Sequence, residues 1–442
     1  MTSVVDRGTT GAEIPSRESW PGELSPGAID RTIDGLIVVF LGFLVPLVSL
    51  FRGHWLEYFL PVGLALSFLH LLRHGVLWRD YFHVVPRIAF FSVGAFILLG
   101  FLAALRVFDA DEPYENLRAF VAPLVVYLAF YGVIFFVMIR GSALAARILK
   151  GLLWGTVLAF AILALEPFTG IASEWIYPVA QKTKPFSLAH FNRTLLALAM
   201  LSWLAAPWIT RRFGHAGLAV VPPLAVWLLN FTGESDTVTL GLVPAVAVYF
   251  LALRRPRWVL NAGFLFTILL LLSAPVLYPV IFDLAKNLGE NDRFGFLFRA
   301  EIWDAVALFI SKAPIFGHGM QSTLRFSPLE IANLFFPDKL IYHPHNAFLQ
   351  VWADMGLAGA LAMAGMLWAM WRGLANVGDD RLPHILAMFS FAIAAFVTTH
   401  SLWAAWWLGL LAMVTAYAIA SSGTIAHRQT GTAGGPEAGA AR

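Results

Sequence analysis

The chain contains no cysteine and few charged residues. Without cysteine it can form neither a disulfide framework nor a thiolate-bound metal centre. Charged residues make up 13% of the 442 positions and hydrophobic residues 59%, whereas an ordinary soluble domain has about 25% and roughly 45–50%. A soluble fold cannot bury that much apolar surface, so the composition excludes an ordinary soluble domain and indicates a membrane protein.

The sequence also lacks the motifs of energy-coupled proteins. It has no P-loop, no dinucleotide-binding glycine fingerprint and no zinc-protease motif, and no apolar stretch carries paired acids in its middle. These absences weigh against an energy-coupled pump. The formal net charge of +3 does not indicate a nucleic-acid partner, because Lys and Arg mainly set the orientation of a membrane protein.

Twelve apolar stretches approach the length of about twenty residues that a transmembrane helix needs. They cover residues 33–51, 55–72, 88–105, 119–139, 148–165, 194–210, 216–233, 237–253, 258–280, 347–371, 382–400 and 402–420. The sequence therefore predicts an all-α polytopic membrane protein with about 12 transmembrane helices, with eleven or thirteen as the alternatives.

Basic residues indicate how the chain crosses the membrane. With twelve spans, one set of short loops carries about twice as many Lys and Arg residues as the opposite set, leaving aside one long loop. The positive-inside rule then predicts that both termini are cytoplasmic and that the long loop lies on the outer face, in the periplasm of a Gram-negative cell. We expect a multi-pass protein of the bacterial inner membrane.

The same pattern divides the chain into five parts. Residues 1–28 and 421–442 are polar or rich in small residues, and we predict that they are disordered cytoplasmic tails. No removable signal peptide is expected, because residues 1–28 contain no apolar core before a cleavage site. Transmembrane helices 1–9 are predicted over 29–280, a large periplasmic loop with amphipathic helices over 281–346, and transmembrane helices 10–12 over 347–420.

The long loop contains an amphipathic helical pattern in FRAEIWDAVALFISKA, residues 298–313. One face is apolar, and charged residues lie elsewhere on the helix. The apolar face holds Ile302, Ala305, Val306 and Phe309, and the charged residues are Glu301, Asp304 and Lys312. Pro314 and the glycines at 317 and 319 are expected to end the helix.

Three polar clusters lie at the predicted outer face. The first, QKTKPFSLAHFNRTLL, carries Lys184, His190 and Arg193 directly before the sixth span. Arg193 is expected near a helix N-terminus, where backbone N–H groups and the helix dipole attract anions such as phosphate. The alternative is an interfacial arginine that extends to the lipid headgroups.

The second cluster, RFGFLFRAEIW, carries Arg293 and Arg299. An arginine near the start of an amphipathic helix can grip a diphosphate with both arms of its guanidinium. The alternative is a solvated charge paired with Glu301 or Asp304. Arg325, farther along the same loop, is a further candidate for a substrate contact.

The third cluster, YHPHNAFLQVWADMGLAG, carries Tyr342, His343, His345 and Asn346 before the tenth span. Two histidines one residue apart can indicate a metal, but a proline separates them and no third clear ligand follows. A titratable base is the better interpretation, with Tyr342, His343 and Asn346 as substrate contacts. The alternative is a histidine that is only hydrogen-bonded within a loop.

Together these segments resemble the O-antigen ligase and O-antigen polymerase superfamily. The resemblance rests on Arg299-x3-Trp303, on Pro314-x2-Gly317-x-Gly319 and on His345-Asn346-x9-Gly356-x2-Gly359, and it covers roughly residues 293–360. His190-x-Asn192-Arg193 is also similar to the arginine-bearing segment that ligases carry ahead of a span. Two positions depart from the family pattern. Ser235-Asp236 stands where many relatives have Ser-Arg, and His318 stands where they usually have an apolar residue.

The resemblance implies a glycosyltransferase C-type fold with a periplasmic catalytic loop. It implies an O-antigen ligase that moves O-antigen from undecaprenyl diphosphate to the lipid A core, among membrane lipids and without a cofactor. His345, Arg299 and Arg193 match the family's functional positions. An O-antigen polymerase, a protein O-oligosaccharyltransferase and, from another class, a lipid-linked glycan transporter or flippase are the alternatives.

A diphosphate-linked sugar already has a good leaving group, so the enzyme needs one base and several cations. We assign His345 as the base that deprotonates the acceptor hydroxyl, and Arg193 and Arg299 as the groups that hold the diphosphate. Direct attack by the acceptor predicts inversion, because retention normally needs a carboxylate nucleophile. We expect the reaction to be independent of metal ions.

Overall fold

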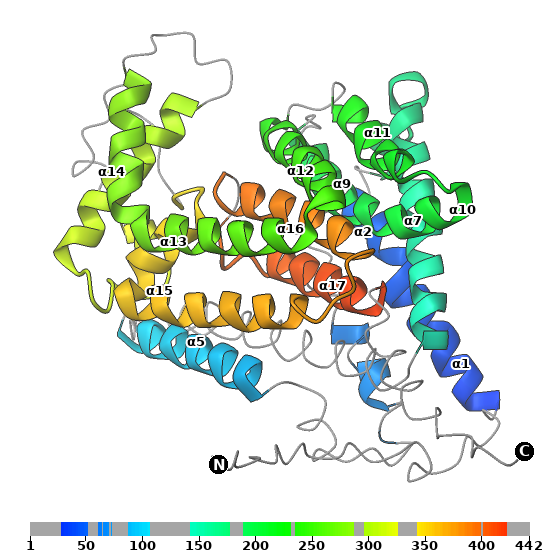
Figure 1. Ribbon diagram of the computed structural model, residues 1–442, viewed down its shortest axis with the longest axis horizontal. Coiled ribbons are helices and arrows are strands. Elements are labelled where there is room, and N and C mark those ends of the chain that lie inside the picture. The colour runs from blue at the N-terminus through cyan, green and yellow to red at the C-terminus, as the bar shows by residue number, and fades with distance from the viewer. Residues whose placement is uncertain are drawn as a thin grey trace, which may run out of the picture.

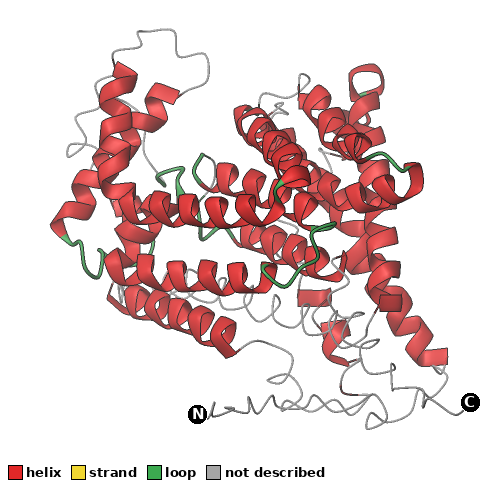
Figure 2. Cartoon of the chain, viewed as in Figure 1, coloured by secondary structure: helices red, strands yellow, loops and turns green. Residues whose placement is uncertain are grey.

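The computed structural model describes residues 28–51, 61–63, 65–69, 72, 87–106, 142–176, 189–230, 235–286, 296–325, 343–398 and 401–421. Within these ranges the regular structure is helical and contains no strand (Figure 2). Backbone groups in a bilayer have no water to bind, so a chain this apolar satisfies them inside helices. The predicted all-α class is confirmed for these residues.

The α-helices have the following bounds: α1 (Ala28–Ile37), α2 (Leu44–Phe51), α5 (Arg87–Arg106), α7 (Ser142–Thr169), α9 (Ala189–Ser202), α10 (Ala206–Phe213), α11 (Val221–Leu229), α12 (Asp236–Arg254), α13 (Pro256–Lys286), α14 (Phe296–Lys312), α15 (Ala347–Leu374), α16 (Leu382–Phe396) and α17 (Ala405–Ser421). Short π- and 3₁₀-helical pieces join some of them: η2 (Val38–Phe43), η3 (Ile171–Ile176), η4 (Trp203–Ala205), η5 (Ala216–Val220) and η7 (Ser322–Arg325).

Helices occupy the predicted apolar stretches wherever the structure describes them. The stretch 119–139 lies outside the described residues, and 55–72 is described only in part. In the described chain, six helices are long and apolar enough to cross a membrane: Arg31–Leu50, Leu144–Thr169, Phe191–Phe213, Asp236–Arg254, Pro256–Lys286 and Ala347–Leu374. The chain is a multi-pass membrane protein, and the total of about 12 spans stays a prediction.

Buried side chains form two clusters. One lies among α1, α2, α7, α9, α12, α16 and α17 and contains the fully buried Trp203, Tyr249 and Trp407. The other joins α5, α13, α14 and α15 around Trp303 and Phe348. In Figure 1, α13, α15 and α5 run side by side, and α14 stands at the end of this group where α15 begins.

The helix predicted over 298–313 is α14, and it ends at Lys312 before Pro314 as expected. Its buried residues include Ile302 and Val306 from the predicted apolar face. The expectation that Glu301 lies away from the buried face is wrong, because only 5% of this residue is exposed. Helix α14 packs against both α13 and α15, so its buried face is wider than the sequence pattern predicts.

Candidate active site

The histidine segment, residues 343–346, leads directly into α15. Asn346 is the N-cap residue of this helix, and its Oδ1 accepts hydrogen bonds from the backbone N of Phe348 at 3.0 Å and of Leu349 at 3.2 Å. Capping satisfies donors that the first turn of a helix leaves unpaired. The side-chain oxygen of Asn346, predicted to contact substrate, is therefore occupied by the cap.

His345 has a backbone conformation that is uncommon for its residue type. Its φ is +50°, in the left-handed region, and it is half-buried. A side chain with a Cβ adopts this region at a cost, and such residues gather at functional sites. The imidazole rings of His343 and His345 lie 4.1 Å apart between centroids. The candidate base therefore stands on a strained turn beside a second imidazole.

His343 is kept neutral by its surroundings. Burial, the largest cause, together with the electrostatic influence of His345 and Arg193, lowers the pKa of its imidazole to about 3. The influence of Arg193 on this pKa indicates that the first and third polar clusters of the sequence lie near each other in the fold. Near neutral pH, His343 acts as a neutral imidazole with one N–H donor and one acceptor nitrogen.

Arg193 lies in the first turns of α9, and its guanidinium carbon is 5.5 Å from the ring centroid of Trp406. Trp406 is in the first turn of α17, while His343 and His345 precede α15. The N-terminal ends of α9, α15 and α17 are thus gathered around one region. Their dipoles add positive potential to that of Arg193, which favours an anionic ligand.

Arg299 lies in the first turn of α14, one helical turn before Trp303. The indole Nε1 of Trp303 donates a hydrogen bond of 3.0 Å to the carbonyl oxygen of Pro344, inside the histidine segment. Trp303 is buried against Tyr278 of α13, with ring centroids 4.9 Å apart. The motif Arg299-x3-Trp303 therefore has a structural explanation, because Trp303 links the helix that carries Arg299 to the segment that contains the candidate base.

The glycine turn, residues 313–319, is bonded to a break in α15. At Gly356 the backbone leaves the helical conformation, with φ +63° and ψ −155°. Beyond the break, Leu357 N donates to the Pro314 oxygen at 2.8 Å, and before it the Ala353 oxygen accepts from His318 N at 2.8 Å. The glycine turn thus replaces hydrogen bonds that the helix loses at its break.

Asp354 sits next to this break and is completely buried. One oxygen accepts from the backbone N and the Oγ of Ser322 at 3.0 and 2.9 Å, and the other accepts from Trp403 Nε1 at 2.5 Å. A buried carboxylate with these donors links the segments of the chain that supply them. Asp354 was not among the predicted site residues, although a lone acid within an apolar span signals a special role.

Of the two departures from the family pattern, His318 has a local explanation, and the structure shows what holds Ser235 beside the second one, Asp236. The ring of His318 stacks on Phe309 with centroids 3.6 Å apart, and its Nε2 lies 2.8 Å from the Phe309 oxygen. Ser235 precedes α12 and is clamped by Asn230, whose Nδ2 donates to the Ser235 oxygen at 2.9 Å. Both residues stabilise the backbone around them.

The remaining predicted residues are placed only in part. His190 lies in the first turn of α9, and Arg325 is the last residue of η7. Lys184, Arg293 and Tyr342 lie outside the described residues. Their predicted contacts with substrate stay predictions.

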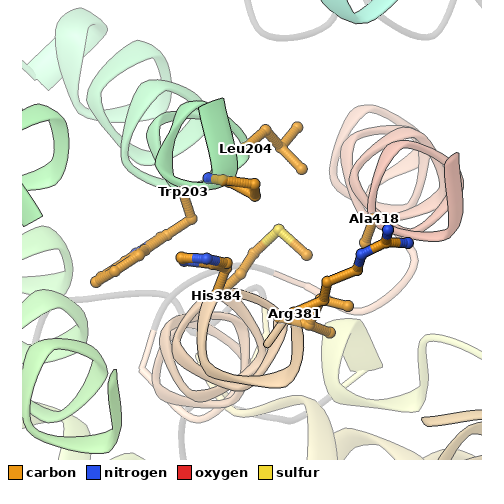
Figure 3. A pocket seen from close by; sticks show the side chains of 8 residues that line it. Trp203, Leu204, Arg381, His384 and Ala418 are labelled. Atoms are coloured by element: carbon orange, nitrogen blue, oxygen red, sulfur yellow. The ribbon is translucent and has the colours of Figure 1, made fainter. Parts of the chain in front are cut away.

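Figure 3 shows a pocket among η4, α10, α16 and α17. It is lined by Trp203, Leu204, Pro207, Arg381, His384, Ile385, Met388 and Ala418. Trp203 follows Arg193 by ten residues in sequence, which corresponds to about 15 Å along the helix. The pocket contains none of the predicted site residues.

Comparisons with known proteins point to one family. The family model described as O-antigen ligase matches residues 224–364. Two relatives carry the name "Putative polysaccharide ligase". One, from Rickettsia bellii, is 21% identical over 274 residues, or 59% of this chain and 64% of the relative. The other, from Rickettsia felis, is 22% identical over 235 residues, or 50% and 56%. No solved structure matches.

The match spans less than two thirds of the length of these two relatives. The matched segment 224–364 contains Arg299, the glycine turn, the histidine segment and the break in α15. The fold and site define a multi-pass membrane protein, helical in the part of the chain that the structure describes, with a basic, histidine-bearing helix junction. The resemblance to the O-antigen ligase family, predicted from the sequence, is confirmed.

Proposed function

We propose that the chain is a membrane glycosyltransferase that moves a glycan from a polyprenyl diphosphate to an acceptor hydroxyl. More specifically, we propose that it is an O-antigen ligase that transfers O-antigen from undecaprenyl diphosphate to the lipid A core. The observation that carries it is the position of His345, on a strained turn where a neutral histidine and Arg193 meet at the starts of three helices. This arrangement combines a base with an anion-binding region.

In the proposed reaction, His345 accepts the proton of the acceptor hydroxyl as the oxygen attacks the anomeric carbon. The bond between that carbon and the diphosphate oxygen breaks, and the bonding electrons leave with the diphosphate. Arg193 and Arg299, together with the N-termini of α9 and α15, stabilise the charge that develops on the leaving group. One displacement inverts the anomeric configuration.

The donor supplies the driving force in this mechanism, so neither ATP nor another cofactor is required. Arginines and helix dipoles take the role that a divalent cation has in other enzymes that act on diphosphates. Asp354 is poorly suited to act as a nucleophile, because both of its oxygens already accept hydrogen bonds in a buried setting. This supports inversion over retention through an aspartyl intermediate.

We propose that the site faces the periplasm and that both termini are cytoplasmic. Arg257 donates to the carbonyl oxygens of Ala375 and Val377, so the α12–α13 and α15–α16 connections lie together at the C-terminal end of α15. This end also carries Arg372 and Arg381. The basic end is expected inside the cell, which supports an outer-face position for the histidine segment at the other end of α15.

The test is a reconstitution with defined substrates. Purified protein is mixed with an undecaprenyl-diphosphate-linked glycan and a lipid A core oligosaccharide, and the products are identified by mass spectrometry. A product whose mass is the sum of glycan and lipid A core supports the ligase. Lengthening of the lipid-linked glycan means a polymerase, glycan on an added protein means a protein O-oligosaccharyltransferase, and movement across liposomes without transfer means a transporter.

A further inference from the structure

A hydrogen bond inside the histidine segment links the two histidines through the backbone. The backbone N of His345 donates to Nδ1 of His343 at 3.3 Å, across the intervening Pro344. A side chain that accepts from the N–H two residues later is the arrangement of an Asx turn, here made by an imidazole. The donor in this bond belongs to His345, the residue with the left-handed φ.

This bond determines what His343 can do chemically. A neutral imidazole has one acceptor nitrogen and one N–H. Since Nδ1 accepts from the backbone, the hydrogen-bond network assigns the proton to Nε2. In this state His343 has no lone pair left for a substrate proton or a metal ion. His345 takes part in this bond through its backbone N alone.

We infer that His343 is a positioning residue, which holds the backbone of His345 in its left-handed conformation and thereby directs the catalytic imidazole toward the acceptor hydroxyl. The inference rests on the proposed function. It assigns different roles to two histidines separated by one residue, whereas a metal site would use both as ligands. Pro344 assists, because its ring fixes φ between them and Trp303 holds its carbonyl oxygen.

The inference predicts which side chains can replace His343. Asparagine has an acceptor oxygen that closes the same turn, and an Asn-Pro pair favours turn formation. Leucine fills a similar volume without an acceptor, and glutamine carries the same amide one methylene farther from the backbone. His343→Asn should therefore preserve the conformation of His345, whereas His343→Leu and His343→Gln should lose it.

The experiment measures kcat and KM for the lipid-linked donor in the full-length protein and these three variants. His343→Asn is expected to keep kcat within about tenfold of wild type, and His343→Leu to lose about 10²-fold, the scale of a misplacement of about 1 Å at a reacting group. The KM for the donor should stay nearly constant. His215→Leu, at an exposed residue after α10, is the matched control and should behave as wild type.

Two results would overturn the inference: an asparagine variant as inactive as the leucine variant, or a leucine variant with the kcat of wild type. If His343→Leu does not purify as a folded protein, the comparison of His343→Asn with His343→Gln decides in its place, and equal kcat values there reject the positioning role. Full transfer by His345→Ala is a separate outcome, because it rejects the proposed function itself.

Discussion

Gly317 and Gly356 pack closely where the glycine turn meets the break in α15, and neither has room for a side chain. A Cβ on Gly317 would lie 2.5 Å from the carbonyl carbon of Asp354, and a Cβ on Gly356 would lie 2.6 Å from the N of Gly317. Both residues have a positive φ, +64° and +63°. The contact joins the glycine turn to α15 eleven residues after the candidate base.

Gly356→Ala should destabilise the fold. A Cβ there combines a left-handed φ with a clash against backbone that cannot move aside, at a cost of about 2 kcal/mol or more. Gly373→Ala is the control on the same helix, since a Cβ at that position meets nothing within 4 Å and alanine favours a helix. Thermal unfolding in detergent should show a lower Tm for the first variant only. Equal Tm values would mean that the contact is dispensable.

His345→Ala should abolish transfer without affecting folding. Loss of a general base typically lowers the rate by about 10² to 10⁴, and the half-buried His345 lies before the helix, outside both buried clusters. The variant should purify and bind lipid-linked donor as wild type does. Near-normal transfer at equal protein concentration would show that another group takes the proton.

Arg193→Lys and Arg299→Lys should each lower kcat/KM by more than about tenfold, equivalent to about 1.4 kcal/mol. Lysine keeps the charge but loses the planar fork that holds two phosphate oxygens. Arg372→Lys, whose guanidinium lies over Trp368 at the other end of α15, serves as the matched control. Wild-type rates in both site variants would mean that these arginines only anchor the chain at the membrane surface.

Transfer should continue in EDTA, because the proposed site neutralises the diphosphate with arginines and helix N-termini. The rate is measured after dialysis against chelator and again after addition of Mg²⁺ or Mn²⁺. A loss in EDTA that one of these ions reverses would mean that the diphosphate is held by a metal.

Acid should destabilise the wild-type protein through His343. The folded-state pKa of about 3 is below the unfolded value of about 6.5, so the unfolded state binds more protons between these values. The stabilisation is complete above pH 6.5 and is lost as the pH falls toward 3, by up to about 2 kcal/mol at pH 5. His343→Asn removes this titration, so its Tm should fall less between pH 7.5 and 5. A parallel decrease would indicate that His343 is solvated.

The helices could be predicted from the sequence because a bilayer leaves an apolar backbone few alternatives to a helix. Helix α14 followed from its periodicity and from Pro314. The approach of Arg193 to His343 could not be predicted, because 150 positions separate them and the tertiary packing of the helices decides how near they come. The burial of Glu301 was missed for a similar reason, since it depends on two neighbouring helices.

The family pattern identified the important glycines but did not explain why glycine is required at these positions. Gly317 and Gly356 are distant in sequence, and only the packing of the glycine turn against the backbone of α15 explains why neither tolerates a side chain. Likewise, His343 and His345 look equivalent as sequence. Their difference comes from one hydrogen bond and one backbone angle, which no composition or spacing encodes.

The shared carboxylate of Asp354 has a consequence for how the protein is made. Its donors come from Ser322, ahead of α15, and from Trp403, in the connection before α17. A ribosome synthesises Trp403 81 residues after Ser322 and 49 residues after Asp354, so the carboxylate and its first donor are made well before the second donor. The active-site end of α15 therefore reaches its final structure only when the C-terminal pair of helices has been inserted, and a chain released before Trp403 lacks one of the donors to Asp354.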